Sequence, residues 1–143
     1  MARKAQTKHN VKSSTAKKVF DDAFVNIVNT FNEAMVNEIK KSMRHKSPPP
    51  SKAGDPPGVK TGTLRRSLAT RPATQFGGKI VTVAGTNVKY ARFLEFAREP
   101  KRRRPFFEPI VKAGRLRPLF EKVLSAQLAT ITAQLSKSAT PKL

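Results

Sequence analysis

A short run of cations carries the chemistry that this sequence could offer to a partner. Five of the seven residues from position 98 to position 104 are basic: Arg98, Lys101, Arg102, Arg103 and Arg104. Guanidinium groups suit paired contacts with the oxygens of phosphates or carboxylates. The run could therefore contact nucleic-acid phosphate, pair with an acidic neighbour across an interface, or simply be solvated. The sequence leaves these three uses open.

The overall charge points to an anionic partner. The 143 residues include 29 Lys+Arg and 9 Asp+Glu, a net charge of +20. Such a chain repels its own copies and is attracted to polyanions, of which nucleic acid is the first candidate and acidic protein surfaces the second. No motif of a sequence-reading protein is present. Any nucleic-acid contact is therefore expected to be electrostatic and independent of base sequence.

Catalysis is not expected from this set of residues. The chain has no cysteine, and its two histidines, His9 and His45, lie far from any predicted apolar pocket. No nucleophile–base pair, paired carboxylates or Walker-type phosphate loop can be identified. We predict that the protein is not an enzyme and binds no metal and no cofactor. No apolar run approaches the about 20 residues of a membrane span, so we expect a cytoplasmic protein, or a particle assembled there.

The clearest predicted element is an amphipathic helix from about residue 14 to residue 44. Its apolar residues recur at spacings of three or four: Phe20, Phe24, Ile27, Phe31, Met35, Ile39 and Met43. We expect this stripe to pack on a sheet or, in part, against a neighbouring subunit. The polar residues expected largely on the other side are Asp21, Asp22, Asn32, Asn37 and Lys41.

A long loop and a short helix follow. Residues 46–60 read KSPPPSKAGDPPGVK, a composition that excludes a helix or a central strand and predicts an exposed loop. Residues 61–68 form a predicted helix that begins with Thr61 as its cap and docks through Leu64 and Leu68. The two arginines between these leucines, Arg65 and Arg66, are expected to point elsewhere.

A hairpin occupies the middle of the chain. Residues 69–76 and 79–86 are predicted strands joined by a Gly77-Gly78 turn. Pro72 requires an edge position or a bulge. Because both faces of the second strand are apolar, we expect both faces to be covered, one of them by the long helix.

Two further helices complete the predicted fold. Residues 90–97 read YARFLEFA and predict a short helix, whose Glu95, like the nearby Glu99, is expected to form ion pairs. A last amphipathic helix begins at Leu116. The fold class is α+β, a small antiparallel sheet packed against helices. We divide the chain into a flexible basic arm (1–13), a single domain (14–137) with an exposed loop at 46–60, and a flexible tail (138–143).

Three ordered motifs resemble those of the neck, or tail-completion, proteins of tailed bacteriophages. Residues 56–68 (PPGVKTGTLRRSL) match a proline-rich loop followed by T-G-x-L-R-x-S, residues 83–96 (VAGTNVKYARFLEF) match a G-T-N-V-x-Y-A stretch with a Glu-aromatic end, and residues 104–109 (RPFFEP) match R-P-F-hydrophobic-x-P. The residues carrying the resemblance are Thr61, Gly62, Leu64, Arg65, Ser67, Gly85, Thr86, Asn87, Tyr90, Ala91, Glu95, Phe96, Arg104, Pro105, Phe106 and Pro109. The chain departs from the family at Ala97-Arg98, where Gly-Thr is common, and in its more basic following segment.

The resemblance implies a structural virion protein that forms a ring at the head–tail junction. Its implied partners are copies of itself, portal, adaptor or head-closure proteins on one side, and tail terminator or tail tube proteins on the other. DNA would pass through the lumen, with possible contacts at Arg98, Lys101, Arg102, Arg103, Arg104, Arg65 and Arg66. Two alternatives stay open: a sequence-independent nucleic-acid-binding protein, motivated by charge, and an assembly factor absent from the mature particle.

Overall fold

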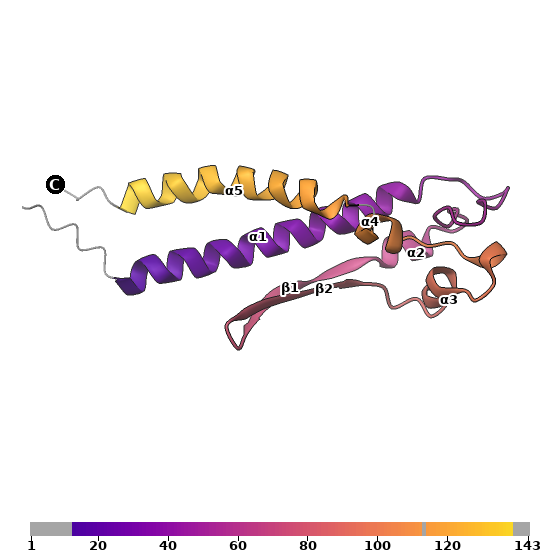
Figure 1. The fold of residues 1–143 in the computed structure, drawn as a ribbon, viewed down its shortest axis with the longest axis horizontal. Coiled ribbons are helices and arrows are strands. Elements are labelled where there is room, and N and C mark those ends of the chain that lie inside the picture. The colour runs from indigo at the N-terminus through magenta and orange to yellow at the C-terminus, as the bar shows by residue number, and fades with distance from the viewer. Residues whose placement is uncertain (1–12, 113, 139–143) are drawn as a thin grey trace, which may run out of the picture.

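The fold is built along one long helix (Figure 1). The computed structural model describes residues 13–112 and 114–138. Helix α1 (Ser13–Ser42) confirms the predicted helix and spans most of the molecule's length (Figure 1). Ile27 and Ile39 of the predicted stripe are buried, but Phe20 and Phe24 are 44% and 53% exposed. Packing of the stripe within the chain is therefore confirmed for its C-terminal part only, and the described chain does not cover the two N-terminal rings.

The hairpin has the predicted strands and turn. Strands β1 (Ala69–Phe76) and β2 (Lys79–Gly85) pair in antiparallel register and form a two-stranded sheet. Gly77 and Gly78 both have positive φ, 57° and 75°, as a tight hairpin turn requires. The register shifts between Arg71 and Thr74. The shift confirms the bulge expected at Pro72, which has no N–H for the ladder.

Two asparagines of α1 satisfy the polar groups that this bulge leaves free. The N–H of Ala73 donates to Asn29 Oδ1 at 2.7 Å. Asn32, only 2% exposed, donates through Nδ2 to Thr82 Oγ1 at 2.7 Å and to the Val83 carbonyl at 3.1 Å. The prediction that Asn32 lies on the solvent side of the helix is therefore wrong, because its amide faces the hairpin and is bonded to β2.

One face of the sheet packs on α1 and the other is open. Ile80, Thr82 and Ala84 are partly buried, whereas Val81 and Val83 are 48% and 54% exposed. The prediction that both faces are covered is wrong within the described chain. Strand β2 does carry apolar residues on both faces, but only the face towards α1 is covered by other described residues.

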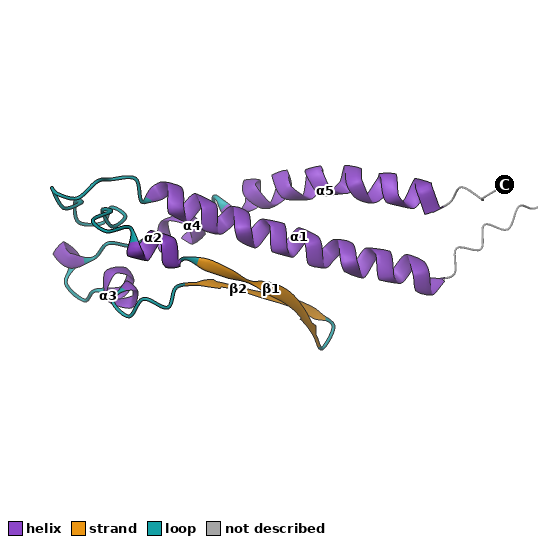
Figure 2. Cartoon of the chain, turned by 180° about the vertical axis from the view of Figure 1, so that it is seen from behind, coloured by secondary structure: helices purple, strands orange, loops and turns teal. Residues whose placement is uncertain are grey.

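The last helix runs back along α1. Helix α5 (Leu116–Ser138) lies beside α1 in both views, and the start of α1 and the end of α5 lie at the same end of the molecule (Figure 2). The Phe31 and Phe120 rings meet edge to face with centroids 5.4 Å apart, and Val123 is buried. Leu128 is half exposed. The predicted amphipathic helix is confirmed, although its far part has little core to cover.

The hydrophobic core lies at the opposite end, beyond the base of the hairpin. Short helices gather there: α2 (Thr63–Ser67), α3 (Ala91–Phe96), the 3₁₀ turn η1 (Pro100–Arg102) and α4 (Glu108–Lys112). They surround a buried cluster made of Val36, Ile39, Met43, Leu64, Leu68, Ala91, Phe106 and Ile110. The segments 61–68 and 90–96 lie past the end of the hairpin (Figures 1 and 2).

The α+β class is confirmed. Residues 1–12 of the expected arm and 139–143 of the expected tail lie outside the described residues, so the division into arm, domain and tail stays a prediction. None of the described helices combines the length and the apolar character needed to cross a membrane.

Candidate functional site

Glu95 organises the end of the molecule where the three motifs meet. Its carboxylate is almost fully buried and accepts three backbone hydrogen bonds: from Phe106 N–H at 2.8 Å, Phe107 N–H at 3.1 Å and Glu108 N–H at 2.8 Å. These N–H groups stand at the start of α4, where no carbonyl of the helix can reach them. Glu95 therefore caps α4. The predicted ion pair of Glu95 is wrong, whereas Glu99 forms one with Arg102 at 3.0 Å.

Arg104 joins the basic run to the proline-rich loop. Its Nε donates to the carbonyl and the hydroxyl of Ser51 at 3.0 and 3.1 Å. Its Nη1 donates to the carbonyls of Lys101 and Arg103 at 2.8 and 2.9 Å. Its backbone N–H donates to the Leu94 carbonyl at 2.8 Å. The guanidinium group is thus occupied by internal partners.

The side chain of Arg103 also bonds to other residues of the same chain. Its Nε donates to the Glu95 carbonyl at 3.0 Å, and its guanidinium group pairs with the Glu108 carboxylate. The hydrogen bond from Lys112 holds the pKa of the Glu108 carboxyl below its ordinary value. Desolvation opposes this shift, and the charge of Arg103 adds to it. Within the run, Arg98 and Lys101 are exposed, and Arg102 shares its charge with Glu99. A partner contact by any of these five stays a prediction.

The proline-rich loop is folded back on the protein. Its base is closed by the Val59 N–H, which donates to the His45 carbonyl at 2.7 Å. Its middle is held by buried Ser51 and by Gly54, whose N–H donates to the Arg103 carbonyl at 3.1 Å. The expectation of a fully projecting loop is therefore wrong for this middle part. Arg104 donates to Ser51 and the Arg103 carbonyl accepts from Gly54, and the loop's own composition does not reveal either partner.

The first motif builds α2 and links it to the second motif. Leu64 and Leu68 are buried, as predicted. Thr61 is not the cap residue, because Gly62 takes that position with φ 74° and no side chain caps the helix. The Ser67 hydroxyl donates to the Leu64 carbonyl at 2.8 Å and lies 2.5 Å from Thr86 Oγ1. With the Ser67 proton engaged, the Thr86 hydroxyl is the donor between the two motifs.

The second motif exposes its aromatic residues. Ala91 is buried and Leu94 packs against the core cluster, but Tyr90, Phe93 and Phe96 are 46%, 66% and 76% exposed. The expectation that this whole segment belongs to the core is therefore corrected. The remaining motif residues lie as follows: Gly85 at the end of β2, Asn87 exposed after it, Pro105 and Phe106 buried, and Pro109 in the first turn of α4.

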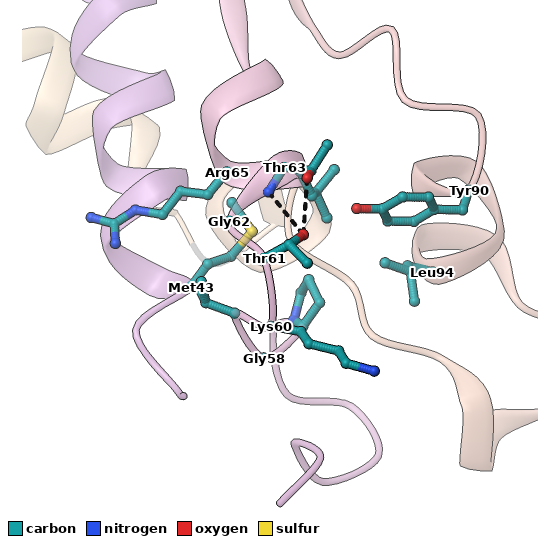
Figure 3. A pocket seen from close by; sticks show the side chains of 12 residues that line it. Met43, Gly58, Lys60, Thr61, Gly62, Thr63, Arg65, Tyr90 and Leu94 are labelled. Carbon is teal, nitrogen blue, oxygen red and sulfur yellow. Dashed lines mark hydrogen bonds between the residues drawn. The ribbon is translucent and has the colours of Figure 1, made fainter. Parts of the chain in front are cut away.

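A cleft of about 270 Å³ separates the first motif from α3 (Figure 3). The Tyr90 hydroxyl points towards Thr61 and Thr63, whose hydroxyls lie 2.9 Å apart. Met43 and Leu94 give the cleft an apolar part. No group of three or more His, Cys, Asp or Glu within residues 13–112 and 114–138 could hold a metal ion. The cleft thus combines hydroxyl groups with an apolar part, an arrangement that suits binding.

Several residues of this end escaped the sequence analysis. Ser51 and the capping role of Glu95 carry no local signal, since their partners lie 53 and 11 to 13 positions away. For Asn29 and Asn32, by contrast, the sequence did contain a local signal. They continue the spacing of the buried Val36, Ile39 and Met43 in steps of three and four, which placed both amides on the core side of α1.

Comparison with protein families gives a match over more than half of the chain. A family described as "Bacteriophage HK97-gp10, putative tail-component" (HK97-gp10-like) matches residues 12–96. The matched segment holds α1, the proline-rich loop, the hairpin, α3 and the first two motifs. No curated protein and no solved structure matches the chain significantly.

Proposed function

The chain belongs to the HK97-gp10-like family of bacteriophage tail components, and we propose that it is a non-enzymatic virion protein that forms a ring where the head joins the tail. The family match over residues 12–96 carries this proposal. The third motif lies beyond the match, yet its Phe106 N–H donates to Glu95 of the second motif, and Thr86 of the second motif is bonded to Ser67 of the first. The three motifs form one structural unit.

Exposed apolar side chains at three places support an assembled state. Phe20 and Phe24 lie on α1, Val81 and Val83 on the open face of the hairpin, and Phe93 and Phe96 on α3. These places belong to different parts of the molecule. In a closed ring, each subunit meets its two neighbours through two different surfaces. A third apolar surface then remains for a protein above or below the ring.

The net charge constrains the partners. Copies with a charge of +20 repel one another unless anions offset the charge. We therefore propose acidic faces on the head-side partners (portal, adaptor or head-closure proteins) or on the tail-side partners (tail terminator or tube proteins). DNA in the lumen would offset the same charge.

We expect that a phage unable to make this chain accumulates heads and tails that do not join stably. Electron microscopy of lysates from a nonsense mutant in a non-suppressing host measures this directly. Complementation by the wild-type chain, and by a Glu99→Gln chain altered only at an exposed carboxylate, should restore joined particles. Normal infectious virions from the mutant would contradict the proposal. Joined wild-type virions lacking the chain by mass spectrometry would instead indicate an assembly factor.

A further inference from the structure

We propose that Lys40, Arg65 and Arg66 form a binding site for the phosphate groups of duplex nucleic acid. The three residues line a cleft of about 410 Å³ between α1 and α2. Its other lining residues come from positions 59–62, and no carboxylate lies among them. The site belongs to a single chain, so the inference does not depend on the ring.

The three cations are not engaged by the protein itself. Among residues 13–112 and 114–138, the ion pairs involve Lys41, Arg102, Arg103, Lys112 and Arg117. None of them involves Lys40, Arg65 or Arg66. The contrast within α1 is direct, because Lys41 is bonded to Glu38 at 2.7 Å while its neighbour Lys40 faces the cleft. Like charges that share one concave surface repel, and a bound anion relieves that repulsion.

Gly62 allows Arg66 to lie in the cleft. Its φ of 74° is in the left-handed region, and a Cβ at this position would stand 2.9 Å from Nη1 of Arg66. The guanidinium group therefore rests against the glycine. Arg65, the other cleft arginine, extends in the opposite direction from Lys60, whose side chain points away from it (Figure 3). The proposed site thus consists of two guanidinium groups and the Lys40 ammonium, while Lys60, which also lines the cleft, extends away from Arg65.

The composition of the cleft favours nucleic acid over an acidic protein. Energetically dominant contacts between proteins usually involve buried aromatic or apolar anchors. Val59 is the one apolar side chain of this lining, while the exposed aromatic rings of this end belong to α3. A duplex presents about one phosphate charge per 1.7 Å along its axis, so it can meet such a cleft in any register. Arg65 and Arg66 were already among the possible DNA contacts named from the sequence, whereas Arg103 and Arg104 of the run at 98–104 are bonded internally.

The test compares two triple variants of the full chain that lose the same charge. Lys40→Gln/Arg65→Gln/Arg66→Gln alters the cleft, and Arg98→Gln/Lys101→Gln/Arg102→Gln alters the exposed part of the basic run. Fluorescence anisotropy with a labelled duplex of about 20 base pairs, at about 50 to 200 mM salt, measures affinity and salt dependence. A polyglutamate chain of matched charge serves as the second probe. Unchanged melting temperatures establish that both variants are folded.

We expect the cleft variant to lose at least about tenfold more affinity for the duplex than the control variant. Its salt slope should fall by about 2 to 3 units, because each lost phosphate contact removes about 0.9. Equal losses in both variants, or a larger loss in the control, would overturn the site. So would wild-type chain that binds polyglutamate but not the duplex. None of these outcomes bears on the joining of heads and tails, which the nonsense mutant tests separately.

Discussion

Replacement of Glu95 by glutamine is expected to destabilise the protein by about 2 to 3 kcal/mol. The carboxylate is 4% exposed and both of its oxygens accept backbone N–H groups. A glutamine keeps the shape but has only one acceptor oxygen. Its NH₂ group must face at least one N–H of the segment that starts α4, so a buried donor loses its partner in either orientation.

Glu99→Gln is the matched control. Glu99 is exposed and pairs with Arg102 on the surface, where such a pair contributes about 0 to 1 kcal/mol. Urea denaturation of both variants, read by circular dichroism, gives the two losses in free energy of unfolding. Equal losses would contradict the capping role of Glu95. A large loss for Glu95→Gln alone would support it.

Replacement of Phe106 by alanine is expected to cost about 3 to 5 kcal/mol. Phe106 is 1% exposed and is the largest of the fully buried side chains among the described residues. It belongs to the cluster that holds α1, α2, α3 and α4 together. Removal of the ring leaves a cavity at the point where all four helices meet, and the short helices have little other core to hold them.

Phe107→Ala provides the comparison, because Phe107 is adjacent in sequence but only partly buried beside the same cluster. We expect it to lose less than half as much stability as Phe106→Ala. Thermal denaturation of the two variants at equal protein concentration decides this. A greater loss of stability for Phe107→Ala than for Phe106→Ala would mean that the Phe107 ring, and not the Phe106 ring, lies in the core.

Local rules account for the parts of the fold that the sequence predicted. The spacing of apolar residues defines α1 and α5, and the Gly77-Gly78 pair defines the hairpin turn. Pro72 required an edge position or a bulge, and the register shifts beside it. The family resemblance is confirmed by a match that covers the first two of the three motifs. Each of these features depends on residues that are close together in the sequence.

The errors arise where a side chain finds its partner far along the chain. Glu95 was expected to pair with a neighbouring arginine, but the N–H groups at the start of α4 offer it three bonds in a buried position. Arg104 was expected to face a partner, and it holds Ser51 of the loop. Periodicity also assumes that an apolar stripe is covered, and it could not indicate that Phe20 and Phe24 are not.

The candidate site shows the same limit. The sequence named Arg65 and Arg66 together with the run at positions 98–104, but it did not indicate that Lys40 of α1 shares a cleft with these two arginines of α2. Only the fold brings these two helices together. Composition correctly indicated that the chain is strongly basic, but not which of its cations are used internally.

A cryo-EM map of the intact virion neck tests the proposed function most directly. We expect a closed ring of copies of this chain between the head connector and the tail tube, with α1 and the hairpin recognisable in each subunit. We also expect the exposed surfaces at Phe20, Val81 and Phe93 to be covered by neighbours. A complete neck without density for this chain, or the chain placed elsewhere in the particle, would contradict the account.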